Sequence, residues 1–182
     1  MMKQLLIINR ERLLYTSKFV AKDNYAYLGG VFFNYGTIAA TDGHYLVEFK
    51  NSFKQFDSAT GEHETYNLRI TKDITKFLKN SKSETIELVE DSTLLYLKDG
   101  ANLQFIEVIP NPYPDYEKVI PMNNNGNLQG SFRLDAERLA TFNYGKKDSL
   151  EITTGLDTYT PIIVKSKNAG EDMTGVLMLM RN

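Results

Sequence analysis

The stretch "TIAATDGHYLVEF", residues 37–49, places an Asp-Gly pair between two runs of strand-forming residues. Such a pair between β-rich runs is typical of a tight hairpin, because Asp and Gly accept the backbone conformations that the turn requires. We therefore predict two antiparallel strands that meet at Asp42 and Gly43. The turn alone does not require Thr41 or His44, and His44 is one of only two histidines in the chain. These two residues are therefore the first candidates for a functional role.

The bulk composition is that of an ordinary soluble globular protein. The chain has 182 residues, of which 42% are hydrophobic and 24% charged, and this length is enough for one sizeable domain or two small ones. A formal net charge of -2 argues against a generally basic nucleic-acid binder, although it leaves local basic patches open. The absence of cysteine excludes disulfides, thiolate metal ligands and a thiol nucleophile. The apolar run 5–8 is too short for a signal peptide or a membrane span, so we expect a cytoplasmic protein without membrane attachment.

A strand, a short amphipathic helix and further strands follow one another three times along the chain. The expected helices are 10–22, 72–80 with Thr71 as N-cap, and a helix from the cap Asp135 to about Asn143. The expected strands are 4–9, 25–34, 37–50, 66–70, 85–90, 93–98, 103–109, 131–134, 149–154, 161–166 and 175–181. Residues 51–64 are polar and loop-like with room for a short strand, and 110–127 hold four of the five prolines and predict an extended linker. The pattern predicts an α+β fold with helices on one face of antiparallel sheets.

The second expected helix carries a basic stripe. Lys72, Lys76 and Lys79 follow at i, i+4 and i+7, while its apolar residues point the other way. A solvated helix face often carries lysines, and this is one interpretation of the stripe. The other is contact with nucleic-acid phosphates without base reading. Weaker basic positions on the remaining helices are Lys18, Lys22 and Arg138.

The sequence offers little for catalysis. Asp42 and His44 flank a turn on alternate residues and are poorly placed to converge on a substrate. No Gly-rich phosphate loop follows a strand, and no histidine pair has metal-ligand spacing, so we expect neither an enzyme, nor a metal site, nor a cofactor.

Three segments in this order resemble the bacterial sliding clamp, the β subunit of DNA polymerase III. They are "YLGGVFFNYGTIAATDGHYLVEF" (27–49), "YPDYEKVIP" (113–121) and "TGVLMLMRN" (174–182). Residues 1–109 resemble the whole middle domain of that clamp, 110–129 its interdomain linker, and 130–182 only the second half of its C-terminal domain. The resemblance implies the DNA-clamp fold with three β-α-β-β-β modules, against six in the full-length bacterial subunit. A form this short would fit a phage or a mobile element.

In the clamp family these segments converge on a hydrophobic groove that takes short peptides from polymerases and other partners. Carried over by position, the groove residues here would be Leu28, Thr41, Gly43, His44, Leu46, Pro114, Tyr116, Lys118, Val119, Val176, Met178, Leu179, Met180 and Arg181. Flexible thioethers suit varied apolar side chains, and His44 and Arg181 could orient polar groups of the peptide. Taken alone, "VLMLM" is equally typical of a core strand. The sequence departs from the family pattern at Tyr45, Glu117 and Leu179, which bears on the peptide that the groove would accept.

The resemblance implies a DNA polymerase processivity factor that encircles or tracks double-stranded DNA, with a polymerase and a clamp loader as partners. Known rings of the family close with twelve modules, so three modules per chain would favour a homotetramer. The alternative is a clamp-like protein that forms no ring and captures replication proteins through their peptides as an adaptor or decoy.

Overall fold

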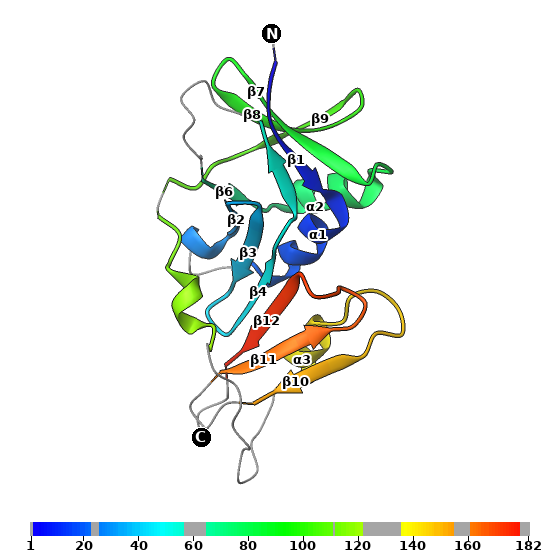
Figure 1. Cartoon of the computed structure of the whole chain (residues 1–182). Coiled ribbons are helices and arrows are strands. Elements are labelled where there is room, and N and C mark those ends of the chain that lie inside the picture. The colour runs from blue at the N-terminus through cyan, green and yellow to red at the C-terminus, as the bar shows by residue number, and fades with distance from the viewer. Residues whose placement is uncertain are drawn as a thin grey trace.

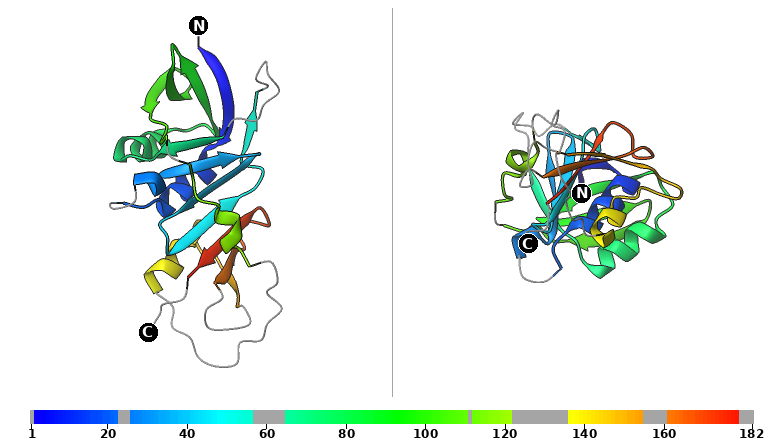
Figure 2. Two further views of the ribbon diagram at one scale, coloured as in Figure 1. Left: turned by 90° about the vertical axis from the view of Figure 1, so that its left-hand side faces the viewer. Right: turned by 90° about the horizontal axis from the view of Figure 1, so that it is seen from below.

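The structure is a computed structural model of the chain. It describes residues 2–22, 26–56, 65–110, 112–121, 136–154 and 161–178. In these ranges the fold is α+β, with antiparallel sheets whose helices lie together on one face (Figures 1 and 2), as the sequence predicts. None of the helices in these ranges is long and apolar enough to cross a membrane.

The predicted pattern of three modules organises the observed elements. The first module comprises β1 (Lys3–Asn9), α1 (Arg10–Thr16), the 3-10 turns η1 (Ser17–Phe19) and η2 (Ala26–Leu28), β2 (Gly30–Asn34), β3 (Thr37–Thr41), β4 (Tyr45–Phe49) and β5 (Phe53–Gln55). The second comprises β6 (Tyr66–Arg69), α2 (Lys72–Asn80), β7 (Thr85–Asp91), β8 (Leu94–Asp99) and β9 (Asn102–Ile106). The third comprises α3 (Ala136–Thr141), β10 (Leu150–Thr153), β11 (Ile162–Ser166) and β12 (Met173–Leu177). Its expected first strand, 131–134, and the expected cap Asp135 lie outside the described residues.

Side-chain caps fix where the first two helices begin. The Asn9 side chain accepts a hydrogen bond from the Arg12 amide at 3.0 Å, and Thr71 Oγ1 accepts one from the Ile74 amide at 3.2 Å. These bonds satisfy amides that have no partner within the helix, which confirms the predicted cap at Thr71. The expected helix 10–22 was too long, because α1 ends at Thr16 and a 3-10 turn follows. This tighter turn inserts Phe19 fully into the core.

The first two modules exchange their leading strands. β1 pairs with β7 of the second module, giving a sheet of order β5-β1-β7-β8-β9. In return β6 pairs with β2 of the first module, within a sheet of order β10-β11-β12-β4-β3-β2-β6. Each sheet is therefore completed by a strand from the other module, so neither module is complete alone. Residues of both sheets and of α1 and α2 share one buried hydrophobic cluster.

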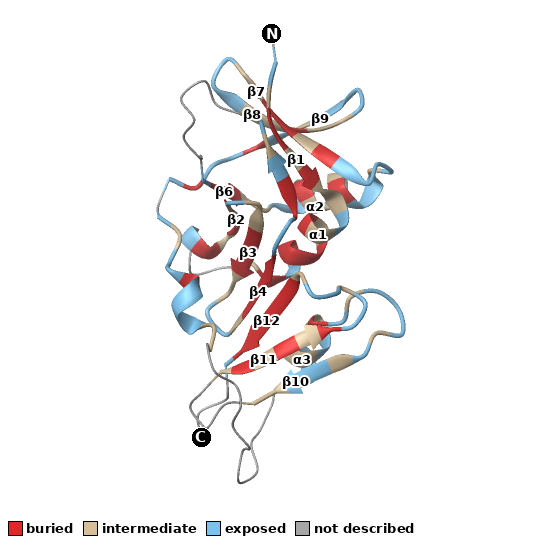
Figure 3. Ribbon diagram, viewed as in Figure 1, coloured by how far each residue is buried: buried red, intermediate tan, exposed pale blue. Residues whose placement is uncertain are grey.

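The third module continues the larger sheet. β12 pairs antiparallel with β4, from Met173 opposite Phe49 to Leu177 opposite Tyr45. Beneath this junction, the ring of Phe142 packs on Phe19 at a centroid distance of 5.1 Å and is fully buried. Figure 3 shows that β12 is buried along its length, as expected for a strand inside a sheet rather than at its edge.

Several predicted boundaries were wrong. Residues 26–28, expected in a strand, form η2, and the linker expected to be extended contains the 3-10 turn η3 (Tyr116–Val119). β9 ends at Ile106, after which Val108 forms only an isolated bridge with Leu68. β12 begins at Met173, before the predicted 175, and its described part ends at Leu177; residues 179–181 of the predicted strand lie outside the described residues. In the linker, the Ile120 amide donates to the Glu117 carbonyl at 3.2 Å and closes the turn η3.

Candidate functional site

The hairpin turn is built by its own side chains. The Asp42 carboxylate accepts hydrogen bonds from the amides of His44 at 2.8 Å and Tyr45 at 3.1 Å. Gly43 has φ of 91°, a conformation that favours glycine, and its amide donates to Thr41 Oγ1 at 3.0 Å. Thr41 Oγ1 in turn donates to the carbonyl of Tyr45 at 2.8 Å. Thr41 and Asp42 therefore fix the turn, and the side chain of His44 is left at an exposed position.

The linker is held against the outer face of the larger sheet by two tyrosines. Tyr113 stacks on Phe32 with ring centroids 4.8 Å apart and planes at 5°. Tyr116 meets Phe32 edge-on at 6.2 Å and joins a second small apolar cluster with Leu46 and Val176. Burial raises the pKa of both tyrosines above the ordinary value. Both phenols therefore stay neutral at physiological pH, and no charge disturbs this anchor.

A groove of about 250 Å³ lies where the hairpin, the linker turn and the end of β12 meet. Its lining residues are Tyr27, Leu28, Thr41, Gly43, His44, Tyr45, Leu46, Pro114, Asp115, Tyr116, Val119, Val176 and Met178. Val119, Met178 and Tyr27 keep between 37% and 41% of their surface exposed. These three residues give the groove an apolar rim that water reaches.

Most of the site residues expected from the sequence lie together in this groove. Those that line it are Leu28, Thr41, Gly43, His44, Leu46, Pro114, Tyr116, Val119, Val176 and Met178. Lys118 does not line it; its ammonium forms a 2.8 Å ion pair with Asp115 and is largely exposed. Leu179, Met180 and Arg181 lie outside the described residues. The Met178 amide donates to the His44 carbonyl at 2.9 Å, which ties the end of β12 to the hairpin.

Sequence reasoning missed three lining residues, Tyr27, Tyr45 and Asp115. Each is a chain neighbour of a residue that was predicted. Tyr45 also packs edge-on against Phe19 at 5.1 Å, so it links the groove to the core. Asp115 belongs to the Pro-Asp-Tyr motif of the linker and places a carboxylate at the groove, paired with Lys118. The motif itself was a usable signal for Asp115.

The lysines of α2 lie on the exposed side of the helix. Lys72, Lys76 and Lys79 are exposed, whereas Ile74 and Leu78 are buried beneath them. Lys18 also projects on the helix side, with its ammonium 4.4 Å from the centre of the Tyr15 ring. Partial burial and the nearby charge of Lys79 lower the pKa of Lys18. Lys18 lies in η1 directly after α1, and α1 packs against α2, so these lysines share one basic surface.

The two remaining basic positions differ. Lys22 is exposed, and Arg138 on α3 is half-buried. Figure 2 shows α1, α2 and α3 on the same side of the sheets, so α3, which carries Arg138, lies on the same side as α2.

The described residues show no grouping suited to metal chemistry. Among them, no group of three or more His, Asp or Glu side chains could hold a metal ion. The carboxylate of Asp42 accepts hydrogen bonds from the backbone amides of His44 and Tyr45 rather than from the His44 imidazole, so the two side chains do not form an acid–base dyad. The geometry offers instead a concave apolar site with a few polar groups, which is the usual form of a binding site.

No family model matches the sequence, and no curated protein matches it. Solved structures do match. Pol III beta from Caulobacter crescentus aligns with a TM-score of 0.71 and 16% identity, covering 100% of this chain and 66% of that chain. A DnaN sliding clamp from Bartonella birtlesii, bound to griselimycin, aligns with a TM-score of 0.74 and 13% identity, covering 98% of this chain and 66% of that chain. The DNA polymerase III β subunit from Thermotoga maritima aligns with a TM-score of 0.69 and 15% identity, again covering 98% of this chain and 66% of that chain.

These likenesses establish the fold. The chain has the sliding-clamp fold that the sequence resemblance predicted, over essentially its whole length. It spans 66% of the length of each of these proteins.

Proposed function

We propose that the protein is a sliding-clamp-like processivity factor for a DNA polymerase, which it tethers by holding a short partner peptide in the groove. The observation that carries the proposal is the groove itself. In a protein with the sliding-clamp fold, the hairpin, the linker turn and the end of β12 enclose one apolar hollow at the site expected from the sequence. The protein needs no chemistry of its own in this role.

The groove suits a peptide with apolar side chains beside polar ones. Leu46, Tyr116 and Val176 form a buried apolar floor, and Val119 and Met178 form a rim exposed enough to close over a bound side chain. His44 and Asp115 supply polar groups at the wall. A Gln- and Leu-rich segment fits this combination, because leucine fills an apolar hollow while the glutamine amide both donates and accepts hydrogen bonds.

The basic surface of the helices would face DNA. Lys72, Lys76 and Lys79 present three flexible cations, with Lys18 beside them. Ammonium groups on long stems neutralise phosphates without reading bases, so the contact would be independent of sequence. The net charge of -2 gives the protein as a whole no attraction for DNA, so the proposal depends on this local basic surface.

A ring would require several copies of the chain. In this proposal residues 1–109 form a two-module domain, 110–129 a linker and 130–182 a half-domain, and four chains supply the twelve modules of a closed ring. A clamp loader would place the ring on DNA. In the described part of the chain, β9 is one of the two edge strands of the smaller sheet, the other being β5, and its Leu103 and Phe105 are 43% and 50% exposed. Closure through such edges removes unpaired strands that otherwise invite aggregation.

Calorimetry with a short Gln-Leu-rich peptide tests the groove. We expect a Kd in the micromolar range, about -8 kcal/mol. Replacing His44 and Met178 together with alanine should weaken binding by about tenfold or more. Leu94→Ala is the matched control, since Leu94 is an exposed apolar residue that does not line the groove. Equal affinity of the double variant and the unmodified protein would refute the groove as the binding site.

A further inference from the structure

The third module leaves one strand edge open, and the equivalent edge is covered in each of the first two modules. The first strand after the helix is β2 in the first module, β7 in the second and β10 in the third. β2 carries β6 on its outer side, and β7 carries β1. In each case the added strand is the one that precedes the helix of the other module. β10 pairs with β11 on one side, and no described strand pairs with its other side.

The core beneath β10 is open at this edge. Ile152 lies opposite Val164, which is fully buried in the main core, so both side chains point to the helix side of the sheet. Ile152 nevertheless keeps 39% of its surface exposed, whereas the core-facing residues Val31 and Phe33 of β2 keep none. Figure 3 shows the contrast between β10 and the buried strand β12. A core-facing isoleucine with this exposure marks a core that lacks one wall.

The helix of the third module is also less buried than the helices of the first two modules. α1 and α2 pack against each other and bury residues such as Leu13, Ile74 and Leu78. α3 has no fully buried residue, and its Leu139 is only partly buried. The open strand edge and the poorly covered helix both belong to the third module. In the first two modules the equivalent edge and helix are covered, because these modules pack on each other.

The outer edge of β10 presents backbone N–H and C=O groups that another strand could pair with. The Lys167 amide donates to the Ser149 carbonyl at 3.0 Å, which places this pair in the hydrogen-bonded register of the β10–β11 ladder. Because the ladder alternates, the backbone groups of Leu150 and Ile152 point away from β11. An added strand would satisfy these groups and cover the exposed side chain of Ile152.

We propose that the third module docks on the third module of a second copy of this chain, through the β10 edge and α3. The first two modules exchange strands reciprocally, so a module with the same arrangement of strands is the partner that this surface fits. A second copy provides such a module. Contact between identical surfaces requires a two-fold axis, which is the commonest symmetry of soluble oligomers. Glu151 lies on β10 itself, and Lys167 just after the neighbouring β11 lines the same hollow, so charges of both signs are present in this part of the module.

This inference goes beyond the proposed function, because the contact does not depend on DNA or on a partner peptide. In the ring of the proposed function, this contact between third modules would be one of the interfaces between chains. Third modules would meet third modules and β9 edges would meet β9 edges, so four chains would alternate in direction around the ring. Such an assembly has dihedral rather than simple cyclic symmetry.

Light scattering on the full chain tests the contact. We expect a mass of at least two chains of 20.8 kDa that falls towards one chain on dilution. Ile152→Lys would bury two unpaired charges at the two-fold contact and should raise the dissociation constant by at least about a hundredfold. Ile152→Val keeps a β-branched apolar side chain and should leave the mass unchanged. A mass of one chain at all concentrations, or an assembly indifferent to Ile152→Lys, would overturn the proposal.

Hydrogen exchange on the unmodified protein gives a second measurement that needs no variant. Peptides covering β10 and α3 should lose protection on dilution, while those covering β1 and β6 should not. Constant protection of β10 on dilution from oligomer to monomer would also overturn the proposal, because it would mean that the chain's own residues cover this edge. Ile152→Lys should bind the Gln-Leu-rich peptide as the unmodified protein does, so failure of the contact and failure of the groove can be told apart.

Discussion

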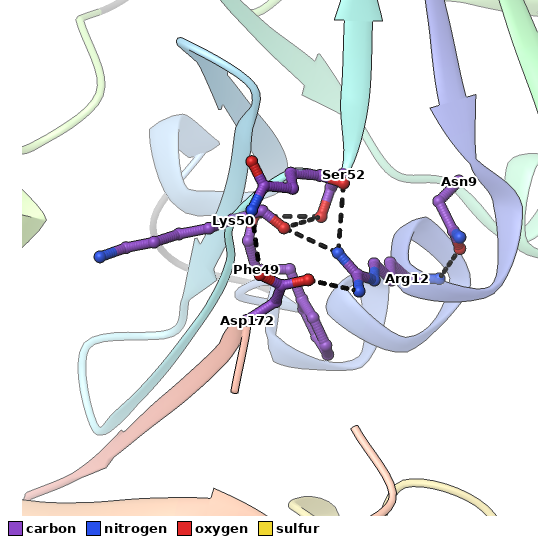
Figure 4. A network of polar contacts seen from close by, with 7 residues as sticks. Asn9, Arg12, Phe49, Lys50, Ser52 and Asp172 are labelled. Carbon is purple, nitrogen blue, oxygen red and sulfur yellow. Dashed lines mark hydrogen bonds and ion pairs between the residues drawn. The ribbon is translucent and has the colours of Figure 1, made fainter. Parts of the chain in front are cut away.

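Arg12 and Asp172, which are 160 residues apart in sequence, form an ion pair with 2.8 Å between Nη2 and Oδ2. Arg12 lies on α1, and Asp172 lies in the turn that leads into β12. The same guanidinium donates to the Lys50 carbonyl at 2.7 Å (Figure 4). The Asn51 side chain donates to Asp172 at 3.0 Å. One cation thus joins the first helix, the loop after β4 and the third module.

We predict that Asp172→Asn loosens this junction. The variant should lower the free energy of unfolding by about 1 kcal/mol, a modest value because the Asp172 side chain is 35% exposed and solvent screens the pair. Urea denaturation at fixed protein concentration measures the change. Glu171→Gln, at the exposed neighbouring acid, should leave stability unchanged. An equal loss in both variants would contradict a specific role of the pair.

The same pair predicts a pH dependence. Hydrogen bonds from Arg12 and Asn51 hold the pKa of Asp172 below its ordinary value. Since the folded pKa is depressed, the contribution is fully present above the unfolded value of about 3.9 and is lost as pH falls through the folded value. The stability difference between Asp172→Asn and the unmodified protein should therefore shrink below pH 4 or so. A difference that persists undiminished in acid would show that the asparagine acts through packing alone.

Gly175 on β12 allows a test of how closely this strand packs on Phe142 of the third module. A Cβ at this position would lie 2.5 Å from a ring carbon of Phe142 and 3.0 Å from the Val164 carbonyl. Gly175→Ala should therefore cost about 1–3 kcal/mol of unfolding free energy. Phe142→Leu should relieve part of the clash, so the double variant should be more stable than the sum of the two single effects. Simple additivity of the two substitutions would argue that the ring and the glycine do not meet.

The stack of Tyr113 on Phe32 should control the groove from outside. Tyr113→Ala removes the stack, frees the linker and should weaken peptide binding several-fold, although Tyr113 does not line the groove. Tyr113→Phe is the matched control. Phenylalanine keeps the ring and therefore the stack on Phe32, so this variant should leave peptide affinity unchanged. Calorimetry would contradict this view if both variants bound alike.

The basic surface makes a prediction about salt. Changing Lys72, Lys76 and Lys79 to glutamate should strongly weaken DNA binding and leave peptide affinity intact. The slope of log affinity against log salt should fall by about 0.9 for each phosphate contact that is lost. The charge-matched control changes the exposed residues Lys3, Lys50 and Lys54 to glutamate. Equal loss of DNA binding in both triple variants would mean that net charge, rather than this helix face, governs the contact.

Local signals predicted much of the fold. The Asp-Gly turn, the Thr71 cap and the bounds of α2 follow from short-range chemistry and agree with the structure. The 3-10 turns η1 and η2 did not follow, because the packing of distant elements sets their geometry. Phe19 illustrates the point, since it turns inward to meet Tyr45 and Phe142, which lie far along the chain.

For the groove, the resemblance of three separated segments supplied ten of its thirteen lining residues. Asp115, Tyr27 and Tyr45 were missed because the motif positions were carried over one by one, while a surface also includes their neighbours. The stack of Tyr113 on Phe32 and the open edge at β10 have no local signature. Both depend on which strands lie side by side, and sequence periodicity does not encode that order.

Retention on circular DNA tests the central claim most directly. The protein is assembled by concentration in the presence of a circular plasmid, and its retention is then measured before and after one restriction cut, at a salt concentration that suppresses direct binding. A ring that encircles DNA without sequence preference should stay on the intact circle and slide off the linear form. Equal retention on both forms, or none on either, would contradict a sliding clamp.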